Sequence, residues 1–118
     1  PSNRMAFEFL MAVHLVTRDV KAALQLLPQA ANLGYSGPLP VYEEAAMVCV
    51  RHGWAKQDVA GPTVTVNGFP ISHETLEKTS QLESMTKARK MTPNELSRLA
   101  EELGLSYFRY YYHREAGQ

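Results

Sequence analysis

The chain has 118 residues, of which 45% are hydrophobic and 20% are charged. This composition is typical of one globular domain and excludes an intrinsically disordered chain. Twelve basic residues balance twelve acidic ones, so no net charge favours nucleic acid, an anionic membrane surface or an acidic partner. The only cysteine is Cys49, which excludes an internal disulfide and a cysteine-cluster metal site.

The apolar stretches of the chain are short. The longest cover residues 9–16 and 45–50, far fewer than the ~20 residues that span a bilayer. We therefore expect a soluble domain. The sequence starts at Pro1 with neither an initiator Met nor a signal peptide, so we interpret it as the C-terminal fragment of a longer protein.

The first half of the chain predicts three helices. Apolar residues recur at a 3.6-residue period over residues 3–17 and again from residue 20 to a stop at Gly34. Pro28 lies inside the second helix, where it removes a backbone hydrogen bond, so we expect a kink there. Pro40 begins a third helix that ends near residue 53.

Residues 54–71 give mixed signals. Thr63–Val66 alternates like a strand, and Asn67-Gly68 is a hairpin turn signal. However, Pro70 cannot donate to a ladder, and a lone hairpin this short is marginal. We therefore expect an ordered connecting loop near residues 60–71. A short β-hairpin over residues 63–71 is the alternative that the sequence leaves open.

Three more helices are predicted in the second half. The fourth begins at Ser72 and runs to about Lys90. The fifth has the clearest local signal, a capping box formed by Thr92 and Glu95 with Pro93 between them. Gly104 ends it, and a short last helix covers residues 106–112. The predicted fold class is all-α, a single domain over residues 1–118 with about five or six helices.

The first two helices resemble a tetratricopeptide repeat when the first aromatic residue sets the register. The positions compared with that pattern are Phe7, Leu10, Met11, His14, Ala23, Leu27 and Ala30. The resemblance covers residues 1–34 as one degenerate helix pair and implies a right-handed stack of helices, with residues 35–118 capping it. Met11, Pro28 and Tyr35 depart from the pattern.

A second resemblance is more particular. The run Asn3–Ala12, the segment Leu39–Ala45 and the aromatic ending are similar to the C-terminal helical region of an uncharacterised family of bacterial proteins whose N-terminal parts span a membrane. This resemblance implies a membrane-anchored parent and brings no activity with it. The side of the membrane is left open.

The repeat resemblance also implies a binding surface. Tetratricopeptide arrays bind peptides on the surface lined by the first helix of each pair, which here presents Met5, Glu8, Ala12 and Leu15. Glu8 and Ala12 stand where the carboxylate-binding subclass has Lys and Asn, so that subclass is not indicated. The alternative is that the same residues pack on neighbouring repeats of the parent chain.

Other candidate sites are weaker. Cys49 and His52 share a helix face, but Cys49 lies on the stripe predicted to be buried, so a structural role is favoured over a nucleophile. The aromatics of residues 107–112 form a core-closing stripe or, alternatively, a stacking surface for single-stranded nucleic acid. No spacing indicates catalytic, cofactor-binding or metal-ligating residues.

From these observations we predict a non-catalytic interaction or scaffolding domain of a larger membrane-anchored bacterial protein. Its partner would be a protein or peptide, or neighbouring repeats of the parent. One alternative is a domain that regulates or positions an enzyme whose catalytic part lies elsewhere in the parent chain. Another is weak binding of single-stranded nucleic acid.

Overall fold

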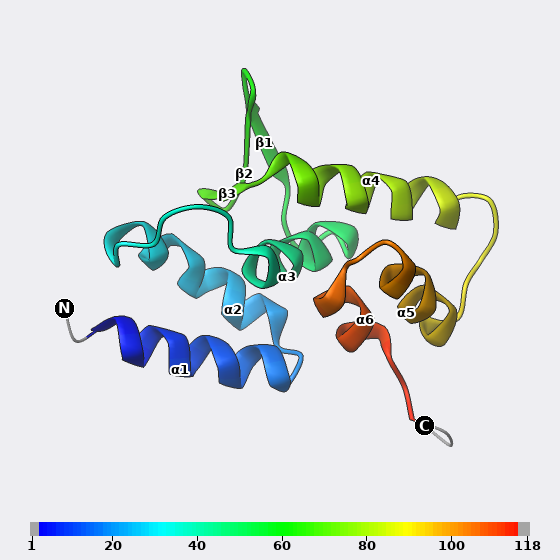
Figure 1. Ribbon diagram of the computed structural model, residues 1–118, viewed down its shortest axis with the longest axis horizontal. Coiled ribbons are helices and arrows are strands. Elements are labelled where there is room, and N and C mark those ends of the chain that lie inside the picture. Colours follow the sequence, from blue (N-terminus) through cyan, green and yellow to red (C-terminus); the bar gives the residue numbers. More distant parts are fainter. Residues whose placement is uncertain (1–2, 116–118) are drawn as a thin grey trace. The chain divides into compact units, whose positions relative to one another are not determined.

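The computed structural model describes residues 3–115. The chain divides into two compact units, Pro1–Ser72 and His73–Gln118. The described residues contain six α-helices, one 3-10 helix and one three-stranded antiparallel sheet (Figure 1). The prediction of a mostly helical protein is confirmed. The all-α prediction is wrong for residues 57–71, where the sheet lies.

The first unit begins with an antiparallel helix pair. Helix α1 covers Asn3–Val16 and α2 covers Val20–Leu26. The turn between them places Arg18 at φ 62°, and the carboxylate of Asp19 caps α2 by accepting from the N–H of Ala22 at 3.2 Å. Helix α2 packs against α1 and also against α3, Pro40–Arg51.

Pro28 ends the α-helical hydrogen bonding of the second helix. In place of the expected kink, α2 stops at Leu26 and the chain continues as the 3-10 helix η1, Leu27–Asn32, with Pro28 in its first turn. A proline in this place needs no donor, which is why the change of helix type occurs here. In residues 3–115, α3 is followed by a sheet and not by a second helix of a pair, so no repeat stack is present.

The sheet is built from two tight hairpins. Its strands are β1, Gln57–Ala60, β2, Thr63–Val66, and β3, Phe69–Ile71, in the order β1-β2-β3. Gly61 at φ 60° opens the first two-residue turn, and Asn67-Gly68, both at positive φ, forms the second. The hairpin signal at Asn67-Gly68 was therefore correct, and the expectation of a loop near residues 60–71 was wrong.

Pro70 fits into the sheet because of its register. Val66 pairs with Phe69 across the two-residue turn, Thr65 with Pro70, and Val64 with Ile71. Hydrogen-bonded and non-hydrogen-bonded pairs alternate along an antiparallel ladder, which places Pro70 in a non-hydrogen-bonded pair. Its missing N–H therefore faces the open edge of β3 and removes no bond to β2.

The core of the first unit lies between the helices and one face of the sheet. Its fully or nearly buried side chains come from every element except β1: Phe7, Met11, Leu15, Val20, Ala23, Leu24, Leu27, Ala30, Ala45, Ala46, Val48, Cys49, Val66, Phe69 and Ile71. The side-chain amide of Asn67 donates to the carbonyl of Leu24 at 3.1 Å and fastens the second turn to α2. The four residues of β1 are all exposed.

The second unit consists of three helices. Helix α4 covers His73–Thr86, α5 covers Pro93–Glu102 and α6 covers Ser106–Tyr112. The capping box of α5 is confirmed, with the N–H of Glu95 donating to the hydroxyl of Thr92 at 3.2 Å and the N–H of Thr92 donating to the carboxylate of Glu95 at 2.9 Å. Helix α4 ends four residues before the predicted Lys90.

Candidate functional site

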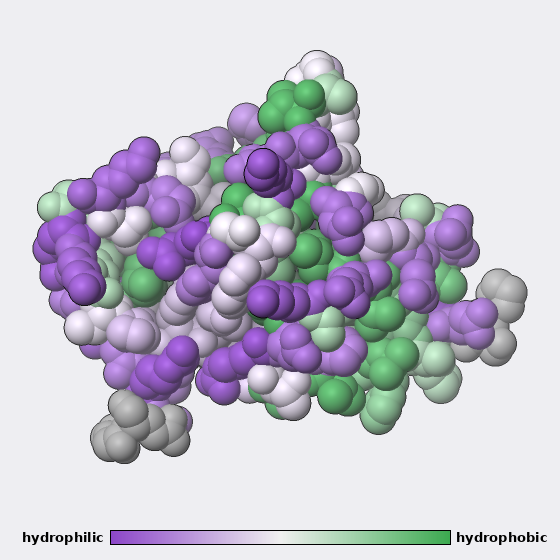
Figure 2. All heavy atoms as spheres, turned by 180° about the vertical axis from the view of Figure 1, so that it is seen from behind, coloured by the Kyte–Doolittle hydropathy of each residue, from purple (hydrophilic) through white to green (hydrophobic). Residues whose placement is uncertain are grey.

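Helix α1 presents hydrophobic side chains to solvent as well as to the core. Met5 is 80% exposed, Phe9 68% and Val16 63%, whereas Met11 is completely buried. Figure 2 shows hydrophobic atoms gathered over the helix on this side. Single exposed apolar residues are common on protein surfaces, whereas several on one side of a helix make that side a candidate interaction surface.

The spacing of these residues explains the exposed series. The buried residues Phe7, Met11 and Leu15 recur every four residues along one side of α1. Five exposed apolar residues lie on the opposite side and together form what we call the outer face of α1: Met5, Phe9, Ala12, Val13 and Val16. Leu10, which is 44% exposed, is not part of this face. Helix α1 is therefore apolar on two sides, and its own unit covers only one of them.

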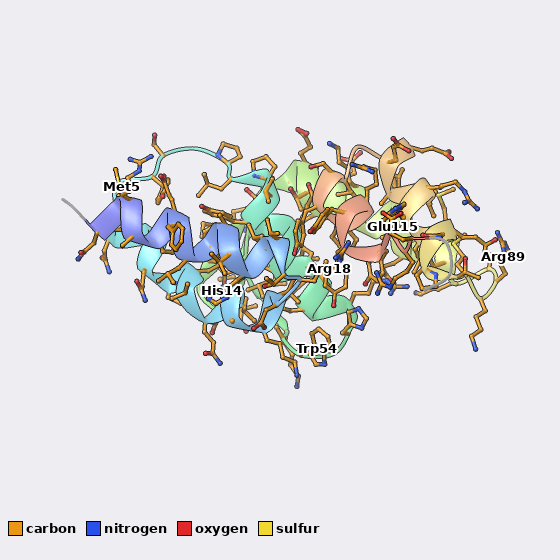
Figure 3. The ribbon with its side chains drawn as sticks, turned by 90° about the horizontal axis from the view of Figure 1, so that it is seen from below. Met5, His14, Arg18, Trp54, Arg89 and Glu115 are labelled. Atoms are coloured by element: carbon orange, nitrogen blue, oxygen red, sulfur yellow. The ribbon has the colours of Figure 1, made fainter. Side chains whose placement is uncertain are left out.

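The four residues of the predicted binding surface do not lie on one side of the helix. Met5 and Ala12 are exposed and belong to the outer face. Leu15 is only 8% exposed and packs into the core, so it does not contribute to the surface. Figure 3 marks Met5 near the start of α1 and His14, which is half-buried, near its end.

Glu8 is exposed but lies beside the outer face in a polar network. The hydroxyl of Tyr35 donates to its carboxylate at 2.7 Å, and Nε of Arg4 donates to the same oxygen at 3.3 Å. The Arg4 guanidinium also lies 4.1 Å from the centre of the Tyr35 ring, a favourable cation–π contact. These contacts fasten the start of α1 to the loop that follows η1.

The network fixes the ionisation of its members. The hydrogen bond from Tyr35, aided by that from Arg4, holds the pKa of the Glu8 carboxyl below its ordinary value. Burial, together with the hydrogen bond to Glu8, raises the pKa of Tyr35 to about 12. At neutral pH Glu8 is therefore charged, Tyr35 is a neutral donor, and the Arg4 charge offsets that of Glu8.

An open pocket of about 260 Å³ adjoins this network. Its lining combines one carboxylate with phenol and aliphatic groups: Glu8, Tyr35, Leu39, Pro40, Val41 and Tyr42. Because the Glu8 charge is already matched by Arg4, the pocket has no unbalanced charge to select an ionic ligand. Five of its six lining residues come from residues 35–42, so it belongs to the loop after η1 and the start of α3 and not to the outer face of α1.

Glu43 is the most deeply placed acid that could suggest chemistry. It is 2% exposed, and its carboxylate accepts from the N–H of Leu39 at 2.9 Å and from the N–H and hydroxyl of Ser72 at 2.9 and 2.7 Å. A carboxylate that accepts this many hydrogen bonds acts as a fixed structural acceptor.

Cys49 is built into the core. Its side chain is completely buried, its thiol donates to the carbonyl of Val20 at 3.4 Å, and burial raises its pKa to about 11. The ring of His52 stacks on Trp54 with 4.6 Å between centroids. A thiol in this setting is a poor nucleophile.

The C-terminal aromatics are divided between core and surface. Tyr107, Phe108 and Tyr112 are buried, while Tyr110 and Tyr111 are half-buried. The binding of single strands by stacking requires exposed ring faces in series. With Tyr112 only 5% exposed, residues 110–112 do not present such a series.

The part of the chain that the structure describes, residues 3–115, contains no group of three or more His, Cys, Asp or Glu side chains placed to hold a metal ion. None of its helices combines the length and the apolar character needed to cross a bilayer.

The described residues thus define a mostly helical protein with a small antiparallel sheet and an exposed apolar helix face. The chain belongs to a family of unknown function, DUF6057, whose model matches residues 1–114. This match gives no support to the tetratricopeptide resemblance of residues 1–34. No curated protein and no solved structure gives a significant match to the chain.

Proposed function

We propose that this protein is a non-catalytic docking domain that binds a protein partner through the outer face of α1. The observation that supports this is the exposure of Met5, Phe9 and Val16 along one side of a well-formed helix. The face contains no charged side chain, so its affinity would come from apolar burial against a complementary helix.

The surroundings of the face favour docking over chemistry. The buried acid and thiol described above, Glu43 and Cys49, are enclosed in the first unit and already hydrogen-bonded.

We further propose that the parent protein is bacterial and membrane-anchored, on the resemblance of Asn3–Ala12 and Leu39–Ala45 to the family of bacterial membrane proteins. Fractionation of cells that make the full-length parent tests this second point, since recovery in the soluble fraction would contradict it.

Site-specific photo-crosslinking tests the docking function. A photoreactive amino acid replaces Phe9 in one variant and, as a matched control, Val59 in another, because Val59 is also an exposed apolar residue at 71%. We expect an identified protein to crosslink at position 9 and not at position 59. Its binding to the purified chain should be lost on Phe9→Glu and kept on Val59→Glu. Equal crosslinking at both positions would refute the proposal.

A further inference from the structure

The outer face of α1 has the spacing of a coiled-coil seam. Met5, Phe9, Ala12 and Val16 follow one another at intervals of four, three and four residues. This is the alternation of a and d positions through which two helices pack side by side. A second helix of matching spacing fits such a seam.

From this pattern we infer that the occupant of the outer face is a second copy of the same helix, packed antiparallel about a twofold axis. This inference rests on the proposed docking function and names its partner. An antiparallel arrangement places each a position opposite a d position. Phe9 then faces Ala12 of the second copy, and Met5 faces Val16 of the second copy.

These pairs are complementary in size. Ala12 is the smallest residue of the seam, and the large ring of Phe9 needs such a gap opposite it. The flexible side chain of Met5 fills the space beside the branched Val16. Alternation of large and small side chains across facing positions lets two helices interdigitate without voids. A parallel arrangement would instead oppose Phe9 to itself.

The charges of α1 do not oppose this pairing. Between Asn3 and Val16 the only Asp, Glu, Lys or Arg residues are Arg4 and Glu8, and they form an ion pair with each other at 3.3 Å. The seam therefore contains no like charges, and the whole chain has a formal net charge of zero. Neither local nor overall repulsion disfavours association.

The area of the face is that of a small interface. Met5, Phe9, Val13 and Val16 of the outer face are exposed by 80, 68, 41 and 63%, which amounts to roughly 450 Å² of surface for side chains of about 150–200 Å² each. Two copies would bury about 900 Å² across the two outer faces, which is below the ~1,200 Å² at which stable specific interfaces begin and in the range of weak, transient ones. We expect a reversible dimer.

A swap of the two facing residues tests the inference in the full chain. Phe9→Ala leaves a gap, and Ala12→Phe opposes two large rings, so each single variant should weaken dimerisation by at least about tenfold. The double variant F9A/A12F restores one large and one small residue in each pair and should dimerise nearly as well as the unchanged chain. Sedimentation equilibrium over a concentration series gives the dissociation constants, and circular dichroism verifies the fold.

Disulfide trapping tests the direction of the helices. We expect M5C and V16C to form a mixed disulfide when the two variants are combined and oxidised, and little disulfide when each is alone. The unchanged chain is the control, because its buried Cys49 should not crosslink. An M5C homodimer would indicate a parallel pair and would overturn the inference.

The outcomes separate this inference from the function on which it rests. A monomeric chain whose position 9 crosslinks to a different protein overturns the second copy as occupant and retains the docking function. A monomeric chain with no position-specific crosslink overturns both. Rescue by F9A/A12F supports both, because a foreign partner has no reason to accept the exchanged residues.

Discussion

The carboxylate of Glu43, in the first turn of α3, accepts two hydrogen bonds from Ser72, one from the backbone N–H at 2.9 Å and one from the hydroxyl at 2.7 Å. Ser72 directly follows β3. The pair therefore joins the start of α3 to the end of the sheet, 29 residues further along the chain. A buried carboxylate that has its donors in place stabilises one arrangement of these elements and penalises others.

Removal of this carboxylate should be strongly destabilising. Glu43→Ala leaves the part-buried donors of Leu39 and Ser72 without their acceptor, and we expect the free energy of unfolding to fall by about 2–4 kcal/mol. Glu77→Ala is the control, because the Glu77 side chain is 62% exposed, and it should change stability by less than about 0.5 kcal/mol. Urea titrations measure both, and equal values for the two variants would contradict the structural role.

The two sides of α1 should respond differently to truncation. Met11 is fully buried, so Met11→Ala should cost about 2–5 kcal/mol of unfolding free energy through lost burial and a cavity. Phe9→Ala removes a larger side chain from the outer face and should cost far less. Unfolding measured at low protein concentration, where a dimer dissociates, gives the intrinsic values. A larger loss for Phe9→Ala would show that Phe9 packs within its own chain.

Glu95 should make stability depend on pH in the acid range. The N–H of Thr92, followed by the guanidinium of Arg89, lowers the pKa of Glu95 from 4.5 to about 2. A group whose pKa is lower in the folded state stabilises the fold above its unfolded pKa, and this stabilisation is lost as the pH falls from about 4.5 toward about 2. Thermal unfolding from pH 7 to pH 2 should therefore show a difference between the unchanged chain and Glu95→Gln that disappears at the acid end.

A second variant distinguishes the causes of this shift. Arg89→Gln removes the ion pair at 2.9 Å and leaves the Thr92 N–H in place. We expect it to return the pKa of Glu95 only part of the way to its ordinary value, as read from the carboxyl signals in an NMR titration. A complete return would assign the shift to Arg89 alone.

Cys49 should resist thiol reagents while the protein is folded. Its burial and its pKa of about 11 leave almost no accessible thiolate at pH 8. Reaction with a chromogenic disulfide should be slow in buffer and fast in denaturant. The M5C variant is the positive control, because its added thiol lies on the exposed face. If the folded, unchanged chain reacted rapidly, Cys49 would again be a candidate nucleophile.

Local signals in the sequence predicted local structure well. Thr92, Pro93 and Glu95 form the predicted capping box, and residues 106–112 form the predicted last helix. Such features depend on residues within one turn of each other, so the chain segment alone determines them. The same holds for Asn67-Gly68, whose turn geometry the sequence indicated correctly.

Features that depend on distant residues could not be predicted in this way. Gln57–Ala60 has no alternating pattern, and it becomes a strand because Thr63–Val66 pairs with it. The register that lets Pro70 lie in β3 without the loss of a hydrogen bond to β2 is likewise a property of the assembled sheet. The length and antiparallel pairing of these strands are set by tertiary contacts, and local propensity does not determine them.

Only part of the candidate site could be predicted, because the rest of it depends on tertiary packing. The 3.6-residue period places Met5 and Ala12 on the first helix but does not say which of its two apolar sides faces α2. Packing against α2 assigns Leu15 to the core and Phe9 and Val16 to the surface. The hydrogen bond between Tyr35 and Glu8 joins residues 27 positions apart, and no sequence signal indicates it.

The hairpin of β1 and β2 also has a practical use. Its turn at Gly61-Pro62 is exposed, and β1 contributes no side chain to the core, so insertions at this turn disturb little packing. The projecting tip seen in Figure 1 is therefore the place to introduce an epitope tag or a fluorescent peptide. A tag placed there leaves α1 unaltered, so labelled and unlabelled chains can be compared in any experiment on its outer face.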